Sequence, residues 1–484
     1  ASRPMPLLTW RGIAGSLAAC YCVSLALWVV HTAVHLEQAA QDLHRATWRF
    51  SFLHPGPAGN ASSQAPQAPR APRFAPTNPV LYMNNYIPEN YVNSHADLRK
   101  AMETSSGNVG NFVWMYGASI LFGSPTAHEF IYSAYGDPNL PIYNAKAFFF
   151  PIANIFQNAS VLHRPGAESV NTTVYNTLDA IMSVDGPTLL VGAGTQGFYR
   201  DNTFFDLEPQ GPVTDVSKYR LEKPHLDLLA GIKKRNGFIM ARGLYSATVF
   251  RAHGFDRVAV AGCPTLFMNP EPGMGVEIKA RLVRLEKRVR QRGYVRILVT
   301  LPPYFRPKLS RLLLTLVLMD RENRLIIQDN RDMDTLNRAV AMNPGLKVPP
   351  EQVAWFTSVA AWREFTERFD FMVSGRIHGM MVALAGLVPG YVIAPDWRVK
   401  ELVQTMMIPH ADPFQTWLHK LPDLNANSIL LTLVSKAESE FNGVEFDRNR
   451  CKIYRMYEKI FEEMKLEINP RLARICTSRG ALGS

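Results

Sequence analysis

Short apolar strands alternate with helices through most of this sequence, and that alternation restricts the fold more than any other feature. The clearest unit is Phe369–Pro409, in which strand, polar turn and helix are followed by a second strand, turn and helix. Repeated units of this length predict a parallel, doubly wound sheet. In such open sheets, ligands bind at the carboxyl edge of the strands.

The polar turn inside this unit has the residue types of an anion site. Residues Ser374–Gly379 (SGRIHG) place a guanidinium and an imidazole between the end of a strand and the start of a helix. A helix N-terminus offers free N–H groups and a positive dipole to an anion. We therefore expect chemistry at this turn, with a core or helix-capping role for His378 as the alternative.

Two earlier strand ends repeat this signal. The expected strand Pro187–Val191 runs into Gly192–Gly197 (GAGTQG), where glycines let backbone N–H groups approach an oxyanion closely. Arg242 follows the expected strand Phe238–Ala241, at the position that Arg376 holds in its own unit. Each arginine could be a surface residue, but two at equivalent positions favour an anion clamp. The glycine loop lacks the dinucleotide fingerprint and the P-loop lysine, which argues against an NAD site and an NTPase.

The chain is basic, which suggests an acidic partner. Its 484 residues carry a formal net charge of +11, with a pI near 9.4. Candidate partners are nucleic acid, an anionic membrane face, and a phosphorylated or carboxylated substrate. Nucleic acid is the weakest of these because no zinc-finger, RRM or homeodomain signature is present. A generally basic surface explains the charge equally well.

One expected helix, in the region after residue 274, concentrates positive charge. Ile278, Leu282, Leu285 and Val289 line one face of it. The rest carries a set of basic residues: Arg281, Arg284, Lys287, Arg288, Arg290 and Arg292. A solvated basic face explains this pattern more simply than contact with an acidic glycan or a membrane.

The N-terminal region has the pattern of a membrane anchor. Residues 13–34 contain no Asp, Glu, Lys or Arg, and about 20 apolar residues suffice to cross a bilayer core. Arg3 and Arg11 stand in the short tail before this segment, so the positive-inside rule favours a cytoplasmic N-terminus. We expect a single-pass type II signal anchor, with a cleaved signal peptide as the alternative. The Pro-rich segment 54–79 cannot bury a core and would form a linker.

This order of segments is typical of a Golgi-resident glycan-modifying enzyme with a luminal body. The expected divisions are a cytoplasmic tail at 1–12, the anchor at 13–34, a stem and linker at 35–78, and Rossmann-like domains at 79–272 and 273–484. The second of these domains includes C-terminal helices. Three glycosylation sequons agree with a luminal body: Asn60, Asn158 and Asn171.

The cysteines do not indicate a metal site. The chain has five of them, and no cluster has the spacing of zinc ligands. Cys451 and Cys476 could form a disulfide in an oxidising compartment, or could remain two buried thiols. We expect no metal.

Four segments, taken in order, resemble the polysaccharide pyruvyl transferases. They are LLVGAGTQG, ARGLYSA, VAGCPTLF and VSGRIHGMMVALAGLVPGYVIAPDWRVKELV. The family's last block is typically a strand, S-x-R-x-H-G, a helix, a small-Pro turn, and then an Asp and a Lys. The chain fits that block at seven positions: Ser374, Arg376, His378, Gly379, Pro389, Asp396 and Lys400.

The chain departs from the family pattern at two places. The family's N-x-G-D appears as Asn108–Asn111 (NVGN), without its Asp. The usual G-D-P appears as Gly262–Pro264 (GCP). Both departures fall in the half of the chain that would contact the acceptor.

The resemblance implies a GT-B-like fold, in which two Rossmann-like domains face a cleft. It also implies phosphoenolpyruvate as donor, a sugar diol (often on galactose) as acceptor, and active-site roles for Arg376 and His378. Histidine can act as acid or base near neutral pH, and arginine grips phosphate or carboxylate bidentately. We expect no further cofactor. The expected substrate-binding residues are Arg242, Ser374, Ile377, Gly379, Gly192, Gly194, Asp396 and Lys400.

Two other functions stay open on the sequence. An ordinary GT-B glycosyltransferase would share the fold and use a nucleotide sugar, although nothing in the chain marks a uridine or guanine pocket. A non-catalytic luminal glycan-binding protein would keep the fold and lose the pair of Arg376 and His378, which this chain retains. A nucleic-acid-binding protein conflicts with the expected anchor.

Overall fold

The computed structural model describes residues 80–83, 107–122, 130–133, 145–153, 155–156, 167–195, 216, 219–303, 305–412 and 415–477. These ranges all belong to one unit, Pro76–Ser484. The expected tail, anchor and stem lie outside the described residues. Within the described ranges, no helix combines the length and the hydropathy that a membrane crossing requires.

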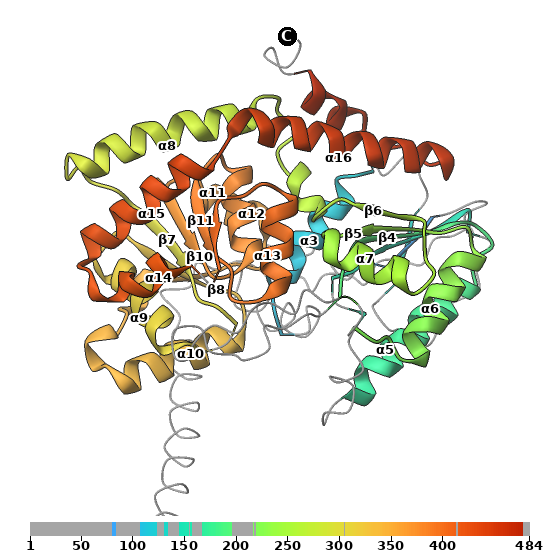
Figure 1. Cartoon of the computed structure of the whole chain (residues 1–484), viewed down its shortest axis with the longest axis horizontal. Helices are drawn as coiled ribbons and strands as arrows, with labels where there is room; N and C mark the ends of the chain where they lie inside the picture. Colours follow the sequence, from blue (N-terminus) through green and yellow to red (C-terminus); the bar gives the residue numbers. More distant parts are fainter. Residues whose placement is uncertain are drawn as a thin grey trace, which may run out of the picture. The chain divides into compact units, whose positions relative to one another are not determined.

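The described strands form two sheets of six strands each, and every neighbouring pair is parallel (Figure 1). The first sheet has the order β2-β1-β3-β4-β5-β6 and the second has the order β12-β11-β10-β7-β8-β9. The strands of the first are β1 (Val80–Met83), β2 (Phe130–Ser133), β3 (Ala147–Pro151), β4 (Thr188–Ala193), β5 (Phe238–Ala241) and β6 (Val258–Val260). Those of the second are β7 (Ile297–Thr300), β8 (Arg324–Ile327), β9 (Val353–Trp355), β10 (Phe371–Ser374), β11 (Gly390–Ile393) and β12 (His410–Ala411).

Helices connect and follow these strands, as the alternating pattern predicts. Within the described ranges they are α3 (Asn111–Ser119), α5 (Ala167–Met182), α6 (Lys223–Lys234), α7 (Leu244–Ala252), α8 (Met274–Arg290), α9 (Pro307–Leu318), α10 (Asn330–Met342), α11 (Val359–Thr366), α12 (Ile377–Ala385), α13 (Trp397–Thr405), α14 (Thr416–Lys420), α15 (Ala426–Glu440) and α16 (Gly443–Glu463). Short 3-10 turns include η3 (Pro264–Phe267) and η7 (Pro470–Cys476). The α/β class with parallel sheets is therefore confirmed. The domain boundary at 272–273 and the cleft stay predictions.

The central strands are buried along their whole length. All residues of β3 (AFFFP) and β10 (FMVS) are buried, as parallel strands covered on both faces require. Helix α12 follows β10 and is also buried on nearly all sides. A Cβ at Gly379 would lie 2.7 Å from Met372 and 3.0 Å from Thr300, so glycine lets α12 pack directly against the sheet.

Helix α12 begins earlier than the sequence predicts. The expected polar turn extended to Gly379, with the helix starting at Met380, whereas the helix starts at Ile377. Arg376 has extended backbone angles and is the N-cap residue. As a result, His378 lies in the first turn of α12, near the N–H groups that have no partner within the helix.

Helix α16 brings the C-terminal region onto the first sheet (Figure 1). The ring of Phe461 lies 5.2 Å from that of Phe122 and 6.3 Å from that of Phe149 on β3. These residues belong to one cluster of buried side chains that also contains the strands of the second sheet. A disulfide between Cys451 and Cys476 joins α16 to η7. The two sheets thus share a continuous hydrophobic core.

Candidate active site

The turn between β10 and α12 is held in place by Ser374. Its Oγ accepts a hydrogen bond from the N–H of Arg376 at 3.1 Å and lies 2.6 Å from Oγ1 of Thr300 on β7. Both hydroxyl-bearing residues are fully buried. Ser374, which the family resemblance assigns to substrate binding, fixes the strand end here, and Ile377 packs into the core.

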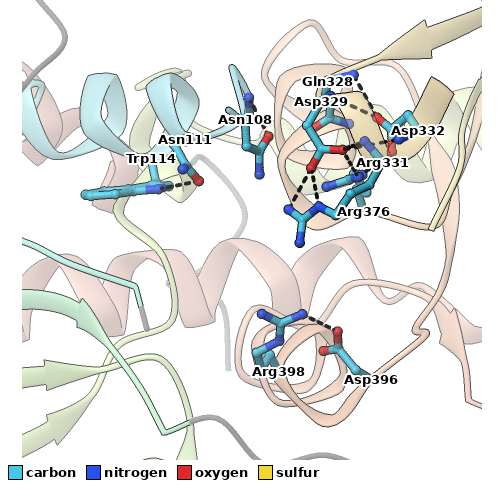
Figure 2. Close-up of polar contacts among 11 residues, drawn as sticks. Asn108, Asn111, Trp114, Gln328, Asp329, Arg331, Asp332, Arg376, Asp396 and Arg398 are labelled. Carbon is cyan, nitrogen blue, oxygen red and sulfur yellow. Dashed lines mark hydrogen bonds and ion pairs between the residues drawn. The ribbon is translucent and has the colours of Figure 1, made fainter. Parts of the chain in front are cut away.

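Arg376 is held by two carboxylates. Its Nη2 lies 3.1 Å from Oδ1 of Asp329 and forms a closer ion pair with Oδ1 of Asp332 (Figure 2). The guanidinium is almost entirely buried. Its Nε is also buried and has no hydrogen-bond partner among the described residues. Arg376 is therefore a fixed positive group with one donor to spare, rather than a mobile clamp.

The two carboxylates come from the start of α10. Asp329 caps this helix by accepting hydrogen bonds from the N–H groups of Arg331 and Asp332. Asp332 in turn accepts from the N–H of Gln328 at 2.7 Å. Burial raises the pKa of Asp332 to about 6, against the opposing effect of Arg376. This group is not among the site residues expected from the sequence, although the segment QDNRD directly follows β8 at the same carboxyl edge of the sheet as Arg376.

The imidazole of His378 is partly buried, and the positive charges of two arginines act on it. Burial, then the charges of Arg376 and Arg398, lower its pKa from 6.5 to about 3. It is therefore neutral at physiological pH in this state. A Cβ at Gly110 would lie 3.0 Å from its Nδ1, so the loop before α3 closes against the ring. Glycine is required at position 110 to leave this space.

The loop before α3 also closes over Gln328. The N–H of Val109 donates to the carbonyl oxygen of Gln328 at 2.9 Å, and Asn108 forms an isolated bridge with Asp329. The side-chain amide of Gln328 is buried, and neither its oxygen nor its nitrogen has a hydrogen-bond partner among the described residues. A Cβ at Gly110 would lie 2.4 Å from that oxygen. An unsatisfied amide therefore stands beside His378, and this too the sequence did not indicate.

The turn after β11 supplies a second ionic group. Asp396 caps α13 by accepting from the N–H of Val399 at 3.1 Å, and it pairs with Arg398 at 2.6 Å (Figure 2). Burial disfavours the charged form of Asp396, but Arg398 and the N–H of Val399 outweigh it and lower the pKa. Lys400, expected to bind substrate, pairs with Asp412 at 2.6 Å.

Arg242 forms a buried ion pair that joins the two halves of the chain. Its Nε lies 3.3 Å from Oε2 of Glu401 on α13, and its Nη2 donates to the carbonyl oxygen of Thr195. Glu401 also accepts from the N–H of Ser246 at 2.5 Å and from its hydroxyl at 2.9 Å. The carboxylate thus occupies the start of α7, where the sequence predicts a bound anion.

The glycines near Arg242 make room for this ion pair. A Cβ at Gly194 would lie 1.9 Å from Nε of Arg242, and a Cβ at Gly243 would lie 1.9 Å from Cγ of Glu401. Gly192 has a φ of +74°, which favours glycine. Packing around this ion pair and the backbone of Gly192 therefore account for the glycines at the expected oxyanion loop.

The structure thus divides the expected site residues into two groups. In the first group, the charges of Arg376 and Arg398 act on His378, and Asp396 pairs with Arg398. Ser374, Ile377 and Gly379 belong to the turn and helix that carry Arg376 and His378. The second group is Arg242, Gly192, Gly194 and Lys400, whose described contacts are made within the chain. Over the described ranges, no group of three or more His, Cys, Asp or Glu side chains could hold a metal.

One family model matches the chain. The model of the polysaccharide pyruvyl transferases covers residues 114–396, which is more than half of the sequence. That span includes Arg242, the aspartates at the start of α10, and the turn that carries Arg376 and His378. Among the curated proteins, none matches this chain.

Several solved structures resemble the chain at low identity. The S. aureus MnaA–UDP co-structure shares 9% identity at a TM-score of 0.38, over 81% of this chain and 98% of that one. A UDP-N-acetylglucosamine 2-epimerase shares 11% identity at a TM-score of 0.36, over 81% of this chain and 97% of that one. A glycosyltransferase from Rickettsia africae shares 10% identity at a TM-score of 0.33, over 80% of this chain and 99% of that one.

Proposed function

The chain belongs to the polysaccharide pyruvyl transferase family, and from that premise we propose the reaction that it performs. The donor is phosphoenolpyruvate, and the acceptor is a sugar diol in a glycan that contains galactose. The product is a pyruvate ketal that bridges two hydroxyls, and phosphate is released. The observation that carries this proposal is the imidazole of His378 in the first turn of α12, on which the positive charges of Arg376 and Arg398 act.

The reaction forms one C–H bond at C3 and two C–O bonds at C2, and it breaks the bond from C2 to the phosphate oxygen. C3 of the enolpyruvate gains a proton, which converts the methylene to a methyl group and makes C2 electrophilic, and the first sugar hydroxyl then adds to C2 and loses its proton. The carbon at C2 then resembles an oxocarbenium ion when its bond to the phosphate oxygen breaks. The second hydroxyl adds to C2, and its proton leaves with the phosphate. A group that can both accept and return a proton is therefore required.

His378 suits the role of proton carrier. Burial and the charges of Arg376 and Arg398 lower its pKa to about 3. The negative charge of a bound donor raises this pKa, since an opposite charge favours the protonated form. The imidazolium then delivers its proton to C3, and the neutral imidazole that results accepts the proton of the attacking hydroxyl. General acid–base catalysis of this kind contributes roughly 10²–10⁴-fold.

The guanidinium groups suit an anionic donor. Arg376 and Arg398 both act on His378 through their positive charge, and the same field favours phosphate and carboxylate. Arg376 is fixed by two carboxylates and keeps its buried Nε as a donor. A fixed charge costs little reorganisation when negative charge develops on the leaving phosphate. We assign Arg376 and Arg398 to donor binding and Arg242 to the support of α13.

The decisive experiment combines the purified full chain in detergent with phosphoenolpyruvate and a panel of galactosides. We expect release of inorganic phosphate in equal amount to an acceptor product that carries one pyruvate by mass spectrometry. UDP- and GDP-sugars serve as competing donors in parallel samples. Sugar transfer from a nucleotide sugar without pyruvylation would contradict the proposal.

Two variants test the assigned residues. His378→Ala and Arg376→Lys should each lower kcat/KM at least about 100-fold, in line with the general acid–base contribution and the loss of a fixed guanidinium. Circular dichroism and thermal melting establish that each variant is folded. Near-normal pyruvylation by folded His378→Ala would exclude the proton-carrier role.

We further propose that the body lies in the lumen of the Golgi, behind the expected N-terminal anchor. The disulfide between Cys451 and Cys476 supports an oxidising compartment. A C-terminal tag on the full chain should be protected from added protease in sealed vesicles and exposed after detergent. Digestion of the tag in sealed vesicles would refute this placement.

A further inference from the structure

A basic groove lies on the surface of helix α8, and no step of the proposed reaction uses it. Its volume is about 340 Å³, near the lower end of ligand-sized pockets. One wall carries three arginines of α8: Arg281, Arg284 and Arg288. Apolar side chains of Leu285, Phe369 and Pro389 and the carboxylate of Asp370 line the rest.

The groove lies at the amino ends of β10 and β11, whereas the candidate active site lies at the carboxyl ends of these strands. Phe369 and Asp370 directly precede β10, and Pro389 directly precedes β11. The active-site residues Arg376 and Asp396 follow the carboxyl ends of the same two strands. A ligand in the groove therefore cannot contact His378, and the groove is a separate site.

Positive charge is in excess around the groove. Glu277 accepts hydrogen bonds from Arg281 and Arg284, and Asp370 accepts from Arg288. Two carboxylates thus face three guanidinium groups, each of which has five N–H donors. The side chain of Arg284 is 65% exposed and that of Arg288 is 44% exposed, so both can reach a ligand from solvent.

The combination of guanidinium groups and an apolar floor identifies the ligand class. Arginine binds carboxylate or sulfate oxygens in a planar, bidentate manner. Leu285, Phe369 and Pro389 add apolar surface to the same groove. Such surface suits the apolar face of a sugar ring, a feature that a free phosphate ion lacks. We propose that this groove binds an acidic sugar unit of a glycan chain, through a carboxylate or sulfate group. This inference does not depend on the proposed reaction.

A direct binding measurement tests the groove without using catalysis. The probes are polygalacturonate as a carboxylated chain, dextran sulfate as a sulfated chain, and neutral dextran, each titrated into the purified full chain in detergent at constant ionic strength. We expect one or both acidic chains to bind and neutral dextran not to bind. Arg284→Gln/Arg288→Gln should weaken binding by about tenfold, and Arg284→Glu/Arg288→Glu by more, because charge reversal adds repulsion.

A control variant with the same change in net charge distinguishes binding in the groove from nonspecific binding of acidic chains to a basic protein. Arg290 lies on the same helix and Arg321 is 93% exposed, and neither lines the groove. Arg290→Gln/Arg321→Gln should bind the acidic chains as the parent does. Equal loss in both double variants, no binding by the parent, or equal binding of neutral dextran would overturn the proposal. Because the readout is binding, a failure of pyruvylation would leave these results unaffected.

Discussion

Gln328 is a polar residue in a buried environment that offers its side-chain amide no hydrogen bond. Both polar atoms of its side chain are buried without a partner among the described residues, which ordinarily costs a protein about 1–3 kcal/mol. Its amide lies against Gly110, beside the imidazole of His378. An unsatisfied polar group at that position is consistent with a substrate hydroxyl or anion as its missing partner.

Replacing Gln328 with Met should therefore raise the stability of the protein and lower its activity. The variant removes the unsatisfied amide at similar volume, so the free energy of unfolding should rise by about 1 kcal/mol. If the amide binds substrate, kcat/KM should fall about tenfold, which corresponds to about 1.4 kcal/mol. Urea denaturation and phosphate release measure the two quantities.

Gln352→Met is the matched control. That amide is also buried, but its Nε2 donates to the carbonyl oxygens of Val317, Asp320 and Asn323. Its loss should lower the free energy of unfolding by about 1–3 kcal/mol, because it leaves buried carbonyls without a donor. A loss of stability in Gln328→Met as large as in this control would mean that Gln328 has a structural partner.

The depressed pKa of His378 predicts a dependence of stability on pH. The unfolded chain takes up a proton near pH 6.5, whereas the folded imidazole resists protonation until about pH 3. The unfolded state therefore binds more protons within that window, and stability falls as the pH is lowered through it. His378→Gln should remove about 1–2 kcal/mol of the decline between pH 6.5 and 5. Urea titrations at each pH measure this, and identical slopes in parent and variant would contradict it.

At the scale of elements, the ion pair between Arg242 and Glu401 connects the start of α7 to α13. Both side chains are about 3% exposed, and Gly243, the N-cap residue of α7, has no capping side chain of its own. Glu401 fulfils that role from the other half of the chain. Because Asp396 is the N-cap residue of α13 and Arg398 lies in its first turn, this contact also positions the charge that acts on His378.

Breaking this pair from one side should be costly. Glu401→Leu would leave a buried guanidinium without its carboxylate and should cost about 3–5 kcal/mol, whereas Arg242→Met/Glu401→Leu should recover much of that loss. The exposed pair of Arg290 and Glu286 is the control, because such pairs contribute about 0–1 kcal/mol. A double-mutant cycle in urea measures the coupling, and a coupling energy near zero would show that the contact does not join the two elements.

These contacts also explain what the sequence could and could not predict. The period of apolar residues was enough to predict parallel sheets, and the turn SGRIHG pointed to the edge where Arg376 and His378 lie. Partners distant in sequence were not predictable: Glu401 lies 159 positions after Arg242, and Asp332 lies 44 before Arg376. Because ion pairing depends on the packing of separate units, no local pattern indicated which anion each arginine meets.

At the scale of the whole molecule, the shared core predicts one cooperative unfolding transition for the described body. Phe149 on the first sheet, Leu298 on the second, and Phe461 on α16 belong to a single buried cluster. Neither sheet can therefore lose its packing without exposing apolar surface of the other. Calorimetry of the full chain should give one transition for both sheets.

Phe461→Ala tests this coupling. The ring is fully buried against Phe122 and Phe149, so its removal should cost about 3–5 kcal/mol and lower the Tm. The transition should stay single, because the rest of the cluster still spans both sheets. Val444→Ala is the control on the same helix, since that side chain is 48% exposed and its loss should change stability by less than about 0.5 kcal/mol. Two separate transitions in the parent, or equal effects of the two variants, would mean that α16 does not unite the sheets.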